Sequence, residues 1–127
     1  HMNVWGAIGS GPSLTAEDVA FCRVQGWQLA TCNMGYKIAP DCHLFHAMDD
    51  AWWDLVGMDA TASLSKACEV WSGSLRHANQ HKINYLTWDG KTGYSDQRGH
   101  VHGGKLSGIQ LINIVGWHKP DLVLLLG

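Results

Sequence analysis

The segment from Val4 to Thr15 (VWGAIGSGPSLT) constrains the fold of this chain more than any other. Its apolar residues 4–8 predict a buried strand, and the glycines around Ser10 predict a turn. Thr15, with Asp18 three residues later, is typical of a capping box at the start of a helix. A strand, a glycine turn and a helix in this order direct backbone N–H groups toward an anion. The segment therefore predicts a phosphate- or nucleotide-binding loop at the carboxyl end of the first strand.

A second interpretation of this turn stays open, that of a tight strand-to-helix connection without a ligand. The dinucleotide fingerprint needs a third glycine, and Leu14 stands where that glycine would be. No Gly-Lys-Ser/Thr follows, so the turn is not a Walker A loop. Glu17 and Asp18 also place negative charge in the first turn of the helix, where it competes with a bound phosphate.

Length and composition limit the classes of protein to consider. The 127 residues suit one domain, and we expect residues 3–127 to form it, with His1-Met2 as an expression-tag remnant. A net charge of −2 without a basic block argues against nucleic-acid binding. No apolar run approaches the roughly 20 residues of a membrane span. The four cysteines are far apart and lie in apolar segments, which predicts free thiols in a cytoplasmic protein.

The order of the expected elements predicts an α/β fold, a parallel sheet with helices on both faces. The expected strands cover residues 4–8, 27–32, 42–48 and 122–126, with less certain strands at 66–71 and 83–88. The expected helices cover residues 16–25, 51–56 and 106–115, with a weak helix at 74–81. The glycine-rich segment 89–104 is expected to be a long loop. The continuous apolar run Leu122–Leu126 is typical of a central parallel strand.

Polar residues follow three successive strands of this expected sheet. They are the glycine turn Gly9–Ser13, Asn33 and the pair Asp49-Asp50. Because ligands of parallel sheets bind outside the carboxyl ends of the strands, we expect these residues to share one rim. Asp49 is the candidate for a ribose hydroxyl or for Mg²⁺ beside phosphates, whereas Asp50 is expected to cap the following helix.

These residues resemble a Rossmann-like family. It includes small bacteriophage-encoded proteins and a domain of archaeal-type 6-hydroxymethylpterin pyrophosphokinases, and it is distantly similar to bacterial sialyltransferases that use CMP-sialic acid. The similarity covers the Gly9–Leu14 turn, Asn33, Asp49 and the Ser107-Gly108 pair before the last helix. It includes about half of the chain and omits the middle. The family continues its last strand into an aromatic-Asp pair after the glycine that corresponds to Gly127, so the resemblance implies either a shortened or a naturally minimal form.

The resemblance also implies ligand contacts. In the sialyltransferases the corresponding residues hold a cytidine nucleotide. By that likeness, the phosphate side would be held by Gly9, Ser10, Gly11, Pro12 and Ser13. Asn33 would contact the base or ribose, and Ser107 and Gly108 would contact the other face of the nucleotide. A phage origin would place the protein in the cytoplasm of the host.

The histidines and tryptophans provide further candidates. His100 and His102 would share one face of an extended strand and are candidate catalytic bases or metal ligands, unless they lie in a solvated loop. Arg98 and Lys105 are the basic residues nearest the expected rim. Of the seven tryptophans, Trp5, Trp27, Trp71 and Trp88 are expected in the core. One member of the pair Trp52-Trp53 is expected to be half-exposed, over a pocket or at an interface.

Three hypotheses of function follow. The first is a small protein that binds a nucleotide or nucleotide sugar, with Mg²⁺ as the expected cofactor. A diverged glycosyl- or pyrophosphoryl-transferase is one form of this hypothesis. The second is a non-enzymatic module that engages a host protein or sequesters a nucleotide, with a homodimer as a way to cover the last strand. The third is a metal-dependent hydrolase that uses His100, His102 and Asp49, although the spacing alone assigns no metal site.

Overall fold

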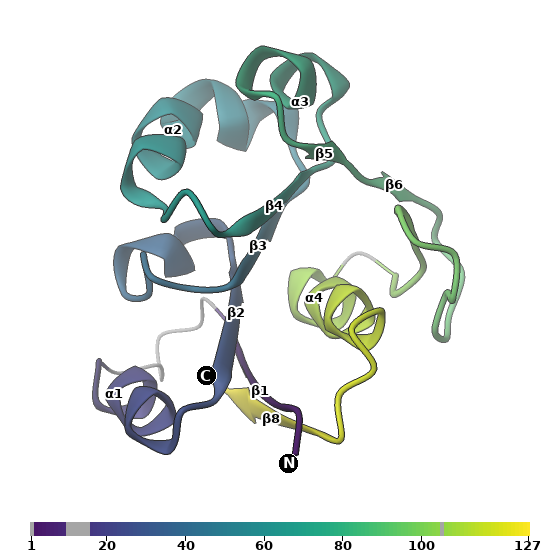
Figure 1. Ribbon diagram of the computed structural model, residues 1–127. Coiled ribbons are helices and arrows are strands. Elements are labelled where there is room, and N and C mark those ends of the chain that lie inside the picture. Colours follow the sequence, from purple (N-terminus) through teal and green to yellow (C-terminus); the bar gives the residue numbers. More distant parts are fainter. Residues whose placement is uncertain (1, 10–15, 105) are drawn as a thin grey trace.

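A six-stranded parallel sheet runs through the middle of the molecule (Figure 1). The computed structural model describes residues 2–9, 16–104 and 106–127, and residues 10–15 and 105 with the predictions made for them lie outside these ranges. The sheet has the order β5-β4-β3-β2-β1-β8. Its strands are β1 (Val4–Ile8), β2 (Gln28–Cys32), β3 (Leu44–Ala47), β4 (Glu69–Ser72), β5 (Asn84–Tyr85) and β8 (Leu122–Leu126).

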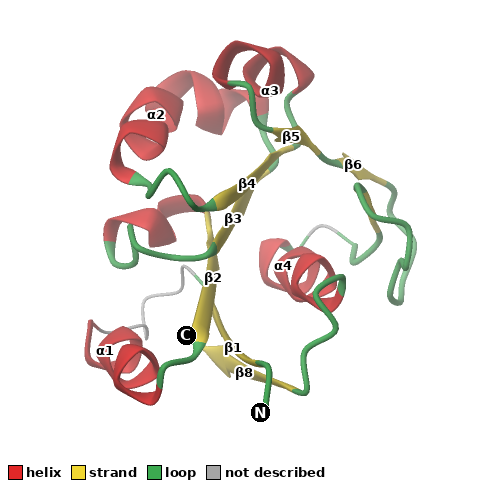
Figure 2. Cartoon of the chain, in the orientation of Figure 1, coloured by secondary structure: helices red, strands yellow, loops and turns green. Residues whose placement is uncertain are grey.

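Helices cover both faces of this sheet, as the sequence predicted (Figure 2). One face carries α1 (Ala16–Gln25), a 3₁₀ helix η1 (Asn33–Lys37), α2 (Asp50–Ser63) and α3 (Leu75–His81). The opposite face carries α4 (Ser107–Gly116). The chain therefore has a Rossmann-like α/β fold. In the described part of the chain no helix has the length and apolar composition of a membrane-spanning segment.

Successive side chains of a strand point to opposite faces of the sheet, so the sheet has two separate cores. In β3, for example, Phe45 packs toward α1 and α2, whereas Leu44 packs toward α4. The first core also contains buried residues of the covering helices, namely Val19, Cys22, Trp53 and Ala60. The second contains Leu111, Ile114 and Val115 of α4. In the described part of the chain α4 is the one helix on this face, where Leu86 and Val101 add to the same core.

A two-stranded parallel sheet completes the α4 face. It pairs β6 (Thr87–Trp88) with β7 (His100–Val101). The segment expected as one strand over residues 83–88 is thus divided between two sheets, with β5 in the large one and β6 in the small one. The segment 89–104, expected as a loop, contributes β7.

The last strand does not occupy the central position that its composition predicted. β8 pairs with β1 and lies at an edge of the sheet, and the side chains of Leu122 and Leu125 are exposed. Its apolar run resembles that of a strand buried on both faces, but the described chain places no strand beyond it and no helix over Leu125.

Candidate functional site

A cavity of about 380 Å³ lies at the carboxyl edge of the sheet, on the side of α4. This volume is within the usual range of small-molecule sites. The cavity is lined by Asn33, Met48, Asp49, Trp88, Ser107 and Gln110. Asn33 and Asp49 were predicted to share a rim, and the resemblance implied that Ser107 contacts the same ligand; the fold does bring these three together.

Asn33 connects two distant parts of the chain at this cavity. It follows β2 and has a positive φ of 50°, a conformation that asparagine adopts more readily than most residues. Its Nδ2 donates a hydrogen bond to Ser107 Oγ at 3.1 Å, although the two residues are 74 positions apart. The end of β2 is thereby joined to the first turn of α4.

Asp49 presents a carboxylate that its helix does not use. It occupies the N-cap position of α2, yet its side chain makes no capping hydrogen bond, and the residue is exposed. Asp50, expected as the cap, is instead the first residue inside the helix, so that prediction was wrong. The exposed carboxylate of Asp49 is therefore available to a ligand in the cavity.

The N-terminus of α4 adds backbone donors beside the cavity. Leu106 is the N-cap residue and provides no side-chain cap. The first intrahelical bond runs from Gln110 N to Leu106 O, so the N–H groups of the preceding three residues have no intrahelical acceptor. N–H groups without an intrahelical acceptor and the helix dipole both favour a negatively charged group at this end.

A second, mainly apolar cavity of about 400 Å³ lies on the other side of this helix terminus, at the ends of β1 and β8. Gly9 and Gly108, both predicted to contact the nucleotide, line this cavity rather than the first. Gly9 N donates to Leu126 O at 2.8 Å, which fixes the end of β1 against β8. The described residues that were predicted to contact the nucleotide are thus divided between two neighbouring cavities. The predictions for Ser10, Gly11, Pro12, Ser13 and Lys105 lie outside the described residues.

Arg98 does not reach the rim. Its guanidinium lies 3.5 Å from a carboxylate oxygen of Glu69 and stacks over the ring of Trp71 at 5.1 Å. Glu69 begins β4, so this ion pair lies at the amino edge of the sheet, opposite the cavity. Arg98, expected as one of the basic residues nearest the rim, is therefore paired at the other edge of the sheet.

Three tryptophans clarify how the site is built. Trp88, expected in the core, is 38% exposed and lines the cavity, with its Nε1 donating to Gly104 O. Trp53 is buried and donates from Nε1 to Ala47 O. Trp52 is half-buried, as expected for one of the pair, but its ring packs against Tyr36 and Phe45. The aromatic group at the cavity is therefore Trp88 and not a member of the Trp52-Trp53 pair.

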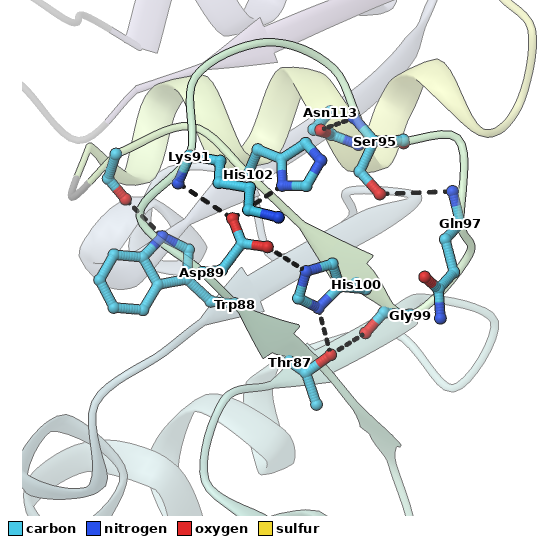
Figure 3. A network of polar contacts seen from close by, with 11 residues as sticks. Thr87, Trp88, Asp89, Lys91, Ser95, Gln97, Gly99, His100, His102 and Asn113 are labelled. Carbon is cyan, nitrogen blue, oxygen red and sulfur yellow. Dashed lines mark hydrogen bonds and ion pairs between the residues drawn. The ribbon is translucent and has the colours of Figure 1, made fainter.

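A carboxylate joins the two candidate histidines next to this cavity (Figure 3). Asp89 Oδ2 lies 2.7 Å from His100 Nε2, and Asp89 Oδ1 lies 2.8 Å from His102 Nδ1. All three side chains are half-buried. The hydrogen bond with His100 is the largest of several effects that hold the pKa of Asp89 far below its usual value, and those with Lys91 N and His102 act in the same direction. The sequence-based pairing of the histidines with Asp49 is thus replaced by a pairing with Asp89.

The hydrogen bonds of Thr87 orient His100. Thr87 Oγ1 lies 3.1 Å from Gly99 O and 2.7 Å from His100 Nδ1. The hydroxyl has one hydrogen, and a carbonyl oxygen can only accept. Both bonds therefore form together only when His100 Nδ1 donates to Thr87, and Nε2 is then the nitrogen directed at Asp89.

No protein family, curated protein or solved structure matches this chain. Its function is therefore inferred from the geometry of the site. Sequence reasoning missed Trp88, Asp89 and Gln110. The Trp-Asp pair at the start of a glycine-rich segment was a usable signal, because an aromatic residue and a carboxylate beside a flexible loop often belong to a binding site.

A buried histidine lies on the same face of the sheet. His46 of β3 is flanked in register by Cys32 and Trp71 and has no exposed surface. Among the described residues, no group lies at hydrogen-bonding geometry to either ring nitrogen. Burial lowers the pKa of His46 to about 4, and the nearby side chain of Gln110 offsets this only in part. His46 is thus held neutral next to a residue that lines the cavity.

Proposed function

We propose that this protein binds a nucleotide or nucleotide sugar in the cavity at the carboxyl edge of the sheet. The observation that carries the proposal is the hydrogen bond between Asn33 and Ser107, which fixes two polar side chains from distant segments beside the carboxylate of Asp49. Ligands of open parallel sheets bind in such a crevice at the carboxyl ends of the strands.

Each lining residue has a chemical role in this proposal. The exposed ring of Trp88 offers a stacking surface for a base. Asp49 accepts hydrogen bonds from ribose hydroxyls or holds Mg²⁺ beside phosphates. The N–H groups at the start of α4 receive a phosphate. Asn33 offers both an amide donor and an acceptor for the base or ribose edge.

A second candidate function is nucleotide sequestration without turnover. Among the described lining residues of the cavity there is no lysine or arginine. Phosphoryl and glycosyl transfer from nucleotides generally relies on cationic groups or metal ions to stabilise the leaving phosphate. The charge of the described cavity thus favours binding over transfer, and a search for product with a nucleotide sugar separates the two.

Isothermal titration against CMP, a UDP-sugar, ATP and GTP, each with and without Mg²⁺, tests the binding proposal. We expect at least one of them to bind with sub-millimolar affinity. Asp49→Asn should weaken that binding by about tenfold, because a hydrogen bond to a charged group contributes roughly 1.5 kcal/mol or more. Trp88→Leu should weaken it by a similar factor through loss of stacking.

The neighbouring residue supplies a matched control. Asp50 is also exposed but does not line the cavity, so Asp50→Asn should leave the affinity unchanged. The absence of heat with all four ligands would reject nucleotide binding. Equal losses in Asp49→Asn and Asp50→Asn would show that the effect is general electrostatics and not a contact.

A further inference from the structure

We propose that Asp89, His100 and His102 form a binding site for one divalent transition-metal ion of the Zn²⁺ class. Their donor atoms all lie within 4.8 Å of one another. Two imidazole nitrogens and one carboxylate oxygen are a common ligand set for zinc and for related ions. The site is separate from the proposed nucleotide contacts and does not depend on them.

The small sheet fixes the three side chains by its register. His100 and His102 are two positions apart on an extended segment, so their rings leave from the same face of the backbone. Asp89 is attached to the neighbouring strand, where its N–H donates to Val101 O at 3.2 Å. Asp89 Oδ1 also accepts a bond from Lys91 N at 2.9 Å. The donors are therefore held in place before any ion binds.

The orientation of His100 meets a further requirement of a metal ligand. A ligating histidine normally donates its second ring N–H to a nearby oxygen, which fixes the ring and its tautomer. Thr87 Oγ1 accepts that bond from Nδ1 at 2.7 Å and leaves Nε2 for the ion. Thr87 is in turn anchored to Gly99 O. The structure thus contains a supporting group for His100 as well as the ligands.

The donor atoms can reach the separations of a metal site by rotation of the side chains. In a tetrahedral zinc site with metal–ligand distances near 2.0–2.1 Å, neighbouring donors lie roughly 3.3–3.5 Å apart. Asp89 contacts His100 through Oδ2 at 2.7 Å and His102 through Oδ1 at 2.8 Å, and one donor atom from each residue already lies within 4.8 Å of the other two. The rings of His100 and His102 are nearly perpendicular, at 84°, so their nitrogens approach a shared point from different directions.

The ligand chemistry selects the class of ion. Mg²⁺ and Ca²⁺ prefer sites made of oxygen, whereas two imidazoles favour Zn²⁺, Co²⁺, Ni²⁺ or Cu²⁺. Three protein ligands leave one position for water or for a group of a bound molecule, as in catalytic zinc sites.

The residues of the proposed metal site are also close in sequence to residues at the cavity. Trp88, which precedes Asp89, lines it. Gly103, which follows His102, packs so closely on α4 that a Cβ there would lie 3.0 Å from Ile109 Cγ2. Asp89 is therefore next in sequence to a residue that lines the cavity, and His102 is next to one that packs on α4.

Addition of CoCl₂ to chelator-treated protein tests the proposal, with ZnCl₂ titrated by calorimetry to count sites. We expect one equivalent of Zn²⁺ to bind and Co²⁺ to produce the visible d–d absorption of a four- or five-coordinate nitrogen and oxygen site. His100→Ala or His102→Ala should weaken binding by about 100-fold or more, and Thr87→Val by about tenfold through loss of its supporting bond. Asp89→Asn removes the charged ligand but keeps the shape of the side chain, so it tests binding in a folded protein.

Two controls distinguish this site from other donors in the chain. Asp96 is an exposed aspartate of the same segment, and His118 is a histidine paired with a different carboxylate, Glu69, at 3.1 Å. Asp96→Asn and His118→Gln should bind as tightly as the wild type. A thiolate-to-cobalt charge-transfer band would place the ion on the cysteines and overturn the assignment. So would the absence of binding at about 100 µM metal, or retention of full affinity in both His100→Ala and His102→Ala.

Discussion

The buried neutral histidine His46, next to the cavity residue Gln110, should make the stability of this protein sensitive to acid. His46 has no exposed surface, and neither of its ring nitrogens has a hydrogen-bond partner among the described residues, so a proton on the ring would be buried with only the side chain of Gln110 to offset the loss of hydration. The burial lowers the pKa of His46 from 6.5 to about 4. Between these two values the unfolded chain binds more protons than the folded one. The free energy of unfolding therefore falls as the pH is lowered through this window.

The size of the pKa shift of His46 determines how much the free energy of unfolding falls on acidification. With these two pKa values, linkage gives a loss of about 2 kcal/mol between about pH 7.5 and about pH 5, and a loss approaching about 3 kcal/mol near pH 4. His46→Leu removes the titrating group and replaces it with an apolar side chain of similar volume. At neutral pH the change in packing is offset by removal of two unpaired buried nitrogens, so we expect a net change of less than about 1.5 kcal/mol.

Urea denaturation of both proteins at the two pH values measures this difference. The wild type should lose about 2 kcal/mol more than His46→Leu on acidification to about pH 5. Leu44→Val is a matched control, because Leu44 lies on the same strand and face, is equally buried and does not titrate. It should cost about 1 kcal/mol at both pH values. If the wild type and His46→Leu lose the same stability on acidification, the buried neutral histidine is not the cause.

Two further predictions concern packing and thiol chemistry. A Cβ at Gly73 would lie 2.7 Å from the backbone oxygen of Met48, so Gly73→Ala should lower the free energy of unfolding by about 2 kcal/mol or more, whereas Gly90→Ala, in open space, should change it by less than about 0.5 kcal/mol. Equal effects on thermal unfolding would contradict this reasoning. The sulfurs of Cys42 and Cys68 lie 3.7 Å apart, so a disulfide reagent should oxidise this pair and lower the thiol titre from four to two, with a mass loss of two hydrogen atoms. A titre that stays at four would show that the two sulfurs do not join.

The fold could be predicted from the sequence because its signals are local. Helix α1 has the predicted bounds, and the strands and α4 lie within a few residues of those expected. The position of β8 could not be predicted, because composition does not report whether another strand pairs beyond it. Helix α2 extends through Gly57 to Ser63, where the sequence suggested an end at Val56. Glycine fits at position 57 inside this helix because the ring of Trp53 packs directly against it.

The candidate site was predictable only where it depends on strand ends. Asn33 and Asp49 follow neighbouring parallel strands, and that placement alone brings them to one edge. The grouping of Asp89 with the histidines depends on how β6 pairs with β7, and two-residue strands carry almost no periodic signal. The prediction that Trp88 lies in the core was wrong for the same reason. The pairing of β6 with β7 decides how exposed Trp88 is, and its apolar neighbours in the sequence do not.

The parallel pairing of β1 with β8 has a consequence for synthesis on the ribosome. β1 is made well before its partner β8, so this edge of β1 stays unpaired until residues 122–126 have emerged. The bond from Gly9 to Leu126 then closes the end of the sheet. A nascent chain exposes the unpaired backbone of β1 throughout this interval, which favours delayed folding and association with chaperones. Strand β1 is therefore made before its partner β8 and gains that partner only after residues 122–126 have emerged.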